Sequence, residues 1–215
     1  MIKLVDFLNI KDCDLKNYKI HFAIGTKDKL EPYQTFLIGD FDEWQSVQAN
    51  RNFNLDYVIS LIYCKKDVWM FAGVFKVCSQ PKTVLHKGKE CWKYTLEKTD
   101  MQNDMIGRAF VEYNKNFRAS YPSLTVKPKN GEAPKDMCIV SISEKRATIN
   151  NFEGFDKINV TYQTLKYIID NDIQSWKSAL SNVKGIYLIS DTKSGKQYVG
   201  SAYGDECIWQ RWQAY

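Results

Sequence analysis

The chain has 215 residues, 44% of them hydrophobic and 14% aromatic, which favours a folded globular protein and argues against intrinsic disorder. Its net charge of +5 is uneven: residues 1–60 carry 7 Lys/Arg against 9 Asp/Glu, residues 61–150 carry 16 against 9, and residues 151–215 carry 7 of each. Asp6 interrupts the apolar run that a signal peptide would need, and no apolar stretch is long enough to cross a bilayer, so we expect a cytoplasmic protein without a membrane partner.

The first 150 residues have the alternating and β-branched pattern of strands. Several short strands at this spacing, with little helix between them, favour a curled sheet or small barrel. The sequence therefore predicts a β-rich, barrel-like N-terminal domain over residues 1–150. The expected strands are 17–24, 55–64, 68–78, 91–98, 106–113 and 137–143, with a long hairpin joining the second and third.

Two other segments interrupt these strands. Residues 37–54 are expected to hold a short helix near Trp44, and residues 122–136, with three prolines and a glycine, are expected to be a loop.

From Thr161 onward the apolar period changes from two to about 3.6. Thr161 is the expected N-cap of this helical segment, and Asp172 is a candidate cap for a second turn. We expect a helical connector over residues 151–182. Its apolar stripe consists of Leu165, Ile168, Ile169, Ile173, Trp176 and Leu180.

Residues 183–215 read as a β-hairpin followed by a helix. The arms are Gly185–Ser190 and Lys196–Gly200, joined by a five-residue turn that ends at Gly195. Tyr187 and Tyr198 lie on opposite arms, so two adjacent strands would hold the pair. Gly200 lets the backbone turn sharply into the next segment. The expected helix carries Trp209, Arg211, Trp212 and Tyr215.

The pair Gly185-Ile186-Tyr187 and Tyr198-Val199-Gly200, with Arg211 downstream, resembles the opening of a GIY-YIG nuclease domain. The resemblance implies metal-assisted hydrolysis of a phosphodiester, with Mg²⁺ or Mn²⁺ as cofactor. It implies that Tyr187 is the general base, that Tyr198 orients the phosphate or the water, and that Arg211 stabilises charge on the phosphate. Tyr215, four residues after Arg211, falls on the same helical face. Because a free tyrosine has a pKa of about 10, such a base needs a nearby cation or metal-bound water.

The chain departs from the family at the metal. GIY-YIG nucleases hold it through a glutamate on a later helix, and nothing follows Tyr215. Asp205 and Glu206 precede Arg211 and are expected to be turn residues. We therefore expect no metal ligand in this chain, a truncated nuclease module, and no activity from these 215 residues alone. A fragment of a longer protein is favoured over a degenerate module.

The basic middle of the chain fits a polyanion such as DNA, although a solvated lysine-rich surface accounts for the charge equally well. Trp44, Trp92 and Tyr121 are the candidates for an aromatic pocket that stacks a base. One strand, Trp69–Val77, weakly resembles PUA-like domains, which read modified bases. The candidate cationic contacts are Lys93, Arg108, Arg118, Lys127 and Lys129.

Cysteine and histidine usage adds little chemistry. The six cysteines are scattered singly, which indicates reduced and mostly buried thiols. His21 and His86 have no partner at ligand spacing, so a structural role is expected for each.

Two functions fit these features. The first is a restriction-like DNA endonuclease with an N-terminal DNA-recognition domain. The alternative is a non-catalytic reader of nucleic acid or modified bases with a degenerate nuclease module. Homodimerisation would help an enzyme cut both strands, but no residue in the sequence indicates it.

Overall fold

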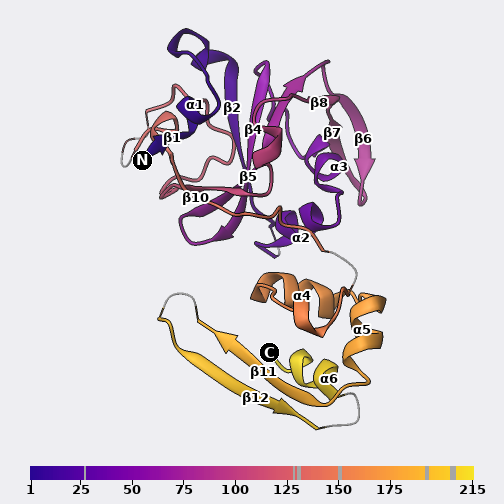
Figure 1. Cartoon of the computed structure of the whole chain (residues 1–215). Helices are drawn as coiled ribbons and strands as arrows, with labels where there is room; N and C mark the ends of the chain where they lie inside the picture. The colour runs from indigo at the N-terminus through magenta and orange to yellow at the C-terminus, as the bar shows by residue number, and fades with distance from the viewer. Residues whose placement is uncertain (27, 128, 130–131, 150–151, 192–193, 204–206) are drawn as a thin grey trace. The chain divides into compact units, whose positions relative to one another are not determined.

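The computed structural model describes all residues except 27, 128, 130–131, 150–151, 192–193 and 204–206. The chain divides into two compact units, Met1–Thr148 and Ile149–Tyr215 (Figure 1). Both units contain helices and strands, which confirms the expected α+β class. The predicted connector 151–182 and the predicted hairpin module 183–215 both lie in the second unit.

The main sheet of the first unit is mixed. Its strands follow the order β1-β10-β9-β5-β4-β2, and β8 pairs with part of β5. Strands β2 and β4 are parallel, and the other neighbours are antiparallel. The bounds are β1 Ile2–Lys3, β2 Tyr18–Ala23, β4 Tyr57–Lys65, β5 Val68–Val77, β8 Leu96–Lys98, β9 Ala109–Glu112 and β10 Cys138–Ile142.

This sheet is open. Among the described residues its two end strands, β1 and β2, do not pair with each other, so the barrel that the sequence favours does not close. A loop borders β2 instead: the amides of Ile20 and Phe22 donate to the carbonyls of Pro122 and Ser120. The predicted loop 122–136 therefore begins where the chain covers the sheet edge.

Strands β4 and β5 form the centre of the core. Ile59, Leu61, Phe71 and Val74 are almost fully buried, and both strands read as nearly continuous buried runs. That pattern is typical of strands covered on both faces. The helices of this unit are α1 Leu4–Phe7, α2 Glu31–Leu37 and α3 Phe41–Ser46, and its short 3-10 turns are Asp12–Asn17, Asn103–Met105 and Pro134–Asp136. Helix α3 is the short helix expected near Trp44; α2 was not predicted.

A second, smaller sheet has the order β3-β7-β6. Its strands are β3 Val47–Gln48, β6 Lys82–His86 and β7 Lys89–Lys93. The single strand predicted over 91–98 is wrong, because the chain changes sheets at Tyr94. The amide of Tyr94 donates to the carbonyl of Ser46, 2.8 Å away, and the following β8 then pairs with β5.

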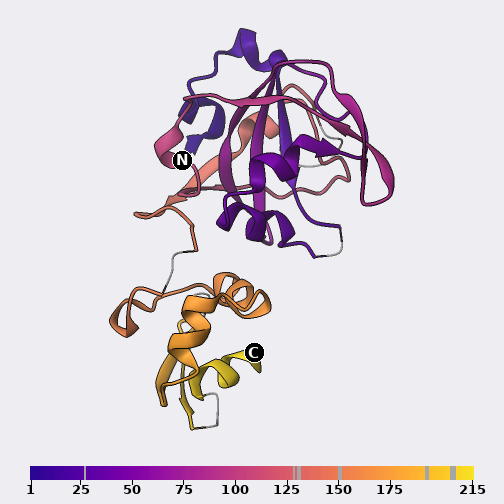
Figure 2. The same cartoon turned by 90° about the vertical axis from the view of Figure 1, so that its right-hand side faces the viewer.

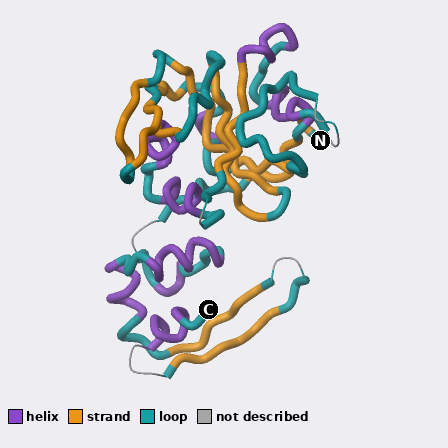
Figure 3. The backbone as a smooth tube through the Cα atoms, turned by 180° about the vertical axis from the view of Figure 1, so that it is seen from behind, coloured by secondary structure: helices purple, strands orange, loops and turns teal. Residues whose placement is uncertain are grey.

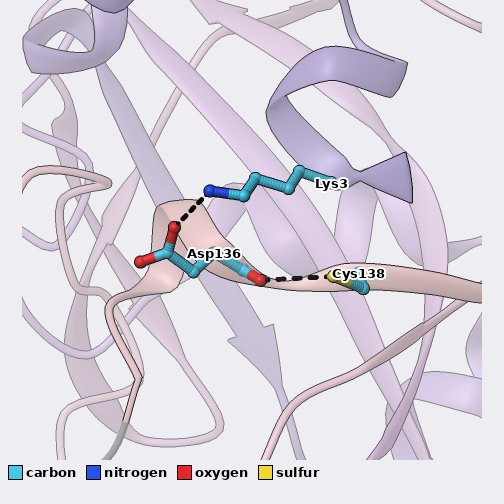
Figure 4. A network of polar contacts seen from close by, with 3 residues as sticks. All are labelled: Lys3, Asp136 and Cys138. Carbon is cyan, nitrogen blue, oxygen red and sulfur yellow. Dashed lines mark hydrogen bonds and ion pairs between the residues drawn. The ribbon is translucent and has the colours of Figure 1, made fainter. Parts of the chain in front are cut away.

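The N-terminus is fastened to the segment before β10. Lys3 on β1 forms an ion pair with Asp136, 2.7 Å apart, and the thiol of Cys138 lies 3.4 Å from the Asp136 carbonyl oxygen (Figure 4). The hydrogen bond to Asp136 raises the pKa of Lys3. Backbone pairing of Ile2 with Ile139 holds the same two segments together.

The second unit packs short helices on one side of a two-stranded hairpin (Figures 1 and 2). A 3-10 turn at Phe155–Lys157 precedes helices α4 Tyr162–Asp170 and α5 Gln174–Leu180. Strands β11 Gly185–Ser190 and β12 Gln197–Ala202 follow, and then helix α6 Cys207–Gln213. Figure 3 shows the two strands as a long ribbon beside the helices. The buried core consists of Ile168, Trp176, Leu180, Tyr187, Ala202, Ile208 and Trp209.

The helix ends of this unit are only partly as predicted. The hydroxyl of Thr161 accepts from the amide of Thr164 at 3.2 Å, so the predicted N-cap of α4 is confirmed. The predicted cap at Asp172 is wrong: this residue has a positive φ of 47° and separates α4 from α5. Its carboxylate pairs with Lys177 instead, at 2.9 Å.

The cysteines are less buried than expected. Cys91 and Cys207 are buried, whereas Cys13 and Cys78 are exposed, and Cys64 and Cys138 are intermediate. No helix among the described residues is both long and apolar enough to span a membrane.

Candidate active site

The register of the hairpin gathers the tyrosine motif on one face. Tyr187 pairs with Gly200 and Ile189 pairs with Tyr198 across the two strands. Because side chains alternate along a strand, Tyr187 and Tyr198 both point to this face. The opposite face carries Ile186, which is exposed.

Gly200 makes room for the Tyr187 ring. A Cβ placed at Gly200 would overlap the ring carbons and the hydroxyl oxygen of Tyr187. The glycine is therefore required by a close approach across the strand pair. The sharp backbone turn predicted at Gly200 is wrong, because β12 continues to Ala202. The buried Tyr187 ring lies against the backbone of β12.

Helix α6 brings a cation to this ring. Ile208 and Trp209 are buried, and Ile208 packs beside Gly185 at the start of β11. The Trp212 ring meets the Tyr187 ring edge to face, with centroids 5.8 Å apart. With these contacts made, Arg211 points toward the hairpin.

The hydroxyl oxygen of Tyr187 is the centre of the cluster. Arg211 donates to it from Nε at 3.2 Å, and the Tyr215 hydroxyl shares a hydrogen bond with it at 2.6 Å. The Arg211 guanidinium also lies 5.9 Å from the centroid of the Tyr215 ring. The sequence placed Tyr215 within the helix, but α6 ends at Gln213 and Tyr215 follows it.

Tyr198 lies at the open side of the same cluster. Its side chain is 49% exposed, whereas Tyr187 is 8% exposed. The hydrogen bond to Tyr187 is the largest cause that raises the pKa of Arg211, and a hydrogen bond to Tyr198 is the second. The hydrogen bond to Tyr187 is also the main cause that raises the pKa of Tyr215 to about 12. A tyrosine hydroxyl is protonated at neutral pH even at its usual pKa of about 10, so Tyr215 can either donate or accept in this hydrogen bond.

One member of the site was not predicted. The hydroxyl of Tyr162, in the first turn of α4, donates to the backbone carbonyl of Tyr215 at 3.1 Å. This bond fixes the residue that contacts Tyr187. No local sequence pattern predicts this hydrogen bond, because Tyr162 and Tyr215 are 53 positions apart.

A shallow cleft of about 370 Å³ adjoins the cluster between the end of β12 and α6. Arg211 forms part of its wall, so the guanidinium is accessible from the cleft. The remaining lining residues are Ser201, Ala202, Tyr203, Cys207, Gln210 and Ala214.

The described residues do not fit the divalent metal that the family resemblance implies. The cluster consists of phenols and a guanidinium, without a carboxylate among the contacts at Tyr187. In the described part of the chain, no three His, Cys, Asp or Glu side chains lie together in a way that could hold a metal ion. Asp205 and Glu206, expected to be turn residues, lie outside the described residues.

Two of the three aromatic candidates of the first unit contact a buried histidine. The ring of His21 stacks on Tyr121 at 5.1 Å and on Trp44 at 6.1 Å between centroids. Trp92 and Tyr121 both pack against the cluster of Phe53, Val58 and Tyr94. Trp44 and Tyr121 are thus each stacked on the buried ring of His21, and whether a base stacks on the candidate aromatics stays a prediction.

A polar network that the sequence did not reveal underlies this cluster. Gln45 Oε1 lies 3.3 Å from His21 Nδ1 and accepts from the Ser60 hydroxyl at 2.6 Å. Tyr121 donates to Gln48 Oε1 at 2.6 Å. Burial lowers the pKa of His21 to about 4, which fits a neutral structural histidine.

The predicted cations differ in availability. Lys93 forms an ion pair with Glu43 at 2.6 Å, and Arg108 donates to the carbonyls of Ser143 and Asp104. The side chains of the other predicted cations, Arg118, Lys127 and Lys129, are exposed.

Comparison with known proteins adds no assignment: no family model matches the chain, and neither a curated protein nor a solved structure is significantly similar to it.

Proposed function

We propose that this protein is a DNA endonuclease and that the Tyr187–Arg211–Tyr215 cluster with Tyr198 acts on a phosphodiester. The observation that carries the proposal is the position of the Tyr187 hydroxyl oxygen, within hydrogen-bond distance of both the Arg211 guanidinium and the Tyr215 hydroxyl. The order of these residues also matches the GIY-YIG pattern in the sequence.

Tyr187 is assigned the role of general base. In this role its phenolate oxygen takes a proton from the attacking water. Arg211 donates to this oxygen and the Tyr215 hydroxyl shares a hydrogen bond with it, so both groups can stabilise negative charge there. The hydrogen bond to Tyr187 raises the pKa of Tyr215 to about 12. The Tyr187 ring, packed against Gly200 and Trp212, has little freedom to leave this position.

Arg211 is assigned to the phosphate. Arg211 bonds to Tyr187 and Tyr198, but a guanidinium has five N–H donors, so donors remain for a phosphate oxygen. A guanidinium can contact two phosphate oxygens at once and stays charged at every relevant pH. Since Arg211 lines the cleft beside α6, a phosphate that enters the cleft meets this charge.

Tyr198 is assigned to orientation. It lies on the same hairpin face as Tyr187 and is half exposed, so its hydroxyl can meet a phosphate oxygen or the attacking water. Mg²⁺ or Mn²⁺ remains part of the proposal through the family resemblance alone. No step is assigned to a metal on the described residues.

The first unit is proposed to select the DNA, in a restriction-like role. Exposed Arg118, Lys127 and Lys129 support contact with phosphates. The weak PUA-like resemblance rests on the sequence of Trp69–Val77 alone.

A plasmid-cleavage assay with Mg²⁺ or Mn²⁺ tests the enzymatic proposal on the protein that carries this chain. We expect Tyr187→Phe and Arg211→Ala each to lower the cleavage rate by roughly 10²–10³-fold, because each removes a group that acts in the transition state. Val199→Thr, an exposed position on the other hairpin face, is the control, since it keeps the shape of the side chain. Equal cleavage by wild type and Tyr187→Phe would refute the assignment.

A second candidate function is a nucleic-acid reader that does not cut. The exposed basic side chains of the first unit favour it, since they need no catalytic partner. In that case wild type and Tyr187→Phe bind duplex DNA equally and neither cleaves it. Binding and cleavage measured on the same samples therefore separate the two candidates.

A further inference from the structure

Strands β6 and β7 form a ribbon that extends beyond the rest of their sheet. Strand β3 pairs only with Trp92 and Lys93, at the base of β7. Among the described residues, the outer parts of the two strands, Val84–His86 and Lys89–Cys91, pair with each other and with no third strand. The ribbon forms the outer edge of the first unit in Figure 1.

The tip of the ribbon is a two-residue turn. Lys87 and Gly88 both have positive φ, 49° and 76°. Turns of this kind match the right-handed twist of paired strands, so they produce a regular and rigid hairpin. Leu85 beside the turn is 80% exposed.

The charge of the ribbon is strongly positive. It carries four lysines against a single acidic residue, Glu90. Lys93, at the base, is paired with Glu43. Lys82, Lys87 and Lys89 are exposed and form no ion pair with any residue of the described part of the chain.

A further cation lies at the base of the ribbon. The guanidinium of Arg51 is 4.2 Å from the centroid of the Trp92 ring on β7. Such stacking fixes the position of the charge without neutralising it. Positively charged side chains therefore lie at both the base and the tip of the ribbon.

The dimensions of the ribbon fit a DNA groove. Two strands of five residues each, at about 3.3 Å per residue, span about 16 Å. The major groove of B-DNA is about 12 Å wide and 8.5 Å deep and admits a two-stranded ribbon. Its rims are the phosphates, which attract lysines.

We propose that the β6–β7 ribbon enters the major groove of duplex DNA, with Lys82, Lys87 and Lys89 on the phosphates that border the groove. The exposed Leu85 at the tip is then available for the methyl groups of thymine on the groove floor. This inference rests on the proposed DNA binding of the first unit and names the element that performs it.

The test compares charge variants of the 215-residue chain in a salt titration. The variant pair is Lys87→Asn with Lys89→Gln, since asparagine tolerates the positive φ that position 87 requires. Lys11→Gln with Lys16→Gln removes the same charge from exposed positions of the acidic N-terminal segment and is the matched control. Binding of a fluorescent duplex is followed by anisotropy, and circular dichroism checks the fold.

We expect the ribbon variant to raise the Kd about tenfold near 0.1 M salt. The slope of log K against log salt should fall by about 2, because each phosphate that a lysine no longer neutralises lowers it by close to 1. The control should change neither quantity beyond a small general effect. Lys89→Arg, which keeps the charge, should bind as wild type does. Occupying the minor groove with a groove-binding drug should leave binding intact.

The outcomes separate this inference from the proposed function. If wild type binds duplex DNA and the ribbon variant binds equally well, the ribbon assignment is wrong while DNA binding stands. If wild type shows no salt-dependent binding, both are wrong. Displacement by the minor-groove drug would overturn the choice of groove.

Discussion

The phenolic oxygen of Tyr187 illustrates how much a single atom depends on residues remote in sequence. Arg211 and Tyr215 reach it from α6 and the segment after it, Gly200 makes space for it from the neighbouring strand, and Tyr162 fixes Tyr215 from α4. The sequence motif named the first three of these partners. It did not name Tyr162, because a contact made through a backbone carbonyl leaves no residue pattern.

His21 gives the first unit a pH-dependent stability. Burial lowers the pKa of this imidazole to about 4 from 6.5, its usual value. Between these values the unfolded chain takes up a proton that the native chain excludes, so stability falls as the pH drops from about 6.5 to about 4. At 1.36 kcal/mol per pKa unit, the loss is on the order of 3 kcal/mol.

Urea unfolding at pH 7 and pH 4.5 checks this expectation. In His21→Gln the difference in unfolding free energy between the two pH values should shrink by roughly 2–3 kcal/mol, whatever the absolute stability of the variant. His86→Gln, at an exposed position, serves as the control substitution. An unaltered pH difference in His21→Gln would show that His21 is protonated in the native protein.

The elements of the chain were predictable wherever one local rule decided them. Alternation located β2, β-branched and aromatic residues located the β4–β5 hairpin, and the Thr161 cap located the start of α4. The segment 91–98 failed, because alternation cannot tell that the chain leaves one sheet for another at Tyr94. Strand β6 was missed because Lys87-Gly88 lacks the Asn or Asp that usually precedes Gly in a two-residue turn.

The β11–β12 hairpin makes a prediction at this scale. In Gly200→Ala the added Cβ must push the Tyr187 ring away from Arg211 and Tyr215, at a cost of about 1–3 kcal/mol in the stability of the second unit. Any cleavage activity should fall together with it. Differential scanning calorimetry measures the stability.

Val199→Thr, one residue away on the opposite face, is the control for this steric effect and should remain near wild type. If Gly200→Ala is as stable and as active as Val199→Thr, then the ring of Tyr187 does not lie against β12.

At the scale of the whole molecule, a core substitution in one unit should lower the stability of that unit and leave the stability of the other unchanged, because the two units have separate cores. Trp209 is fully buried in the core of the second unit. Trp209→Ala should destabilise that unit by about 3–5 kcal/mol and leave the unfolding transition of the first unit in place. Calorimetry of the whole chain resolves the two transitions.

Phe71→Ala, in the core of the first unit, provides the reciprocal experiment. This substitution should lower the temperature of the first unit's unfolding transition and leave that of the second unit unchanged. A common shift of both transitions in either variant would show that the chain unfolds as one cooperative body.

The boundary between the two units was partly predictable from the sequence. The predicted N-terminal domain ends at residue 150, and the change to a helical apolar period comes at Thr161.

The tyrosine hairpin is a sheet of only two strands, and its buried face rests on Ile168, Trp176 and Leu180 from the preceding helices. An isolated pair of strands is at best marginally stable in water. A protein engineer who wishes to transplant the tyrosine motif onto another DNA-binding scaffold must therefore take the chain from about residue 149 onward. A graft that begins at Gly185 would contain the motif residues but lack the preceding helices that hold Tyr187 in place.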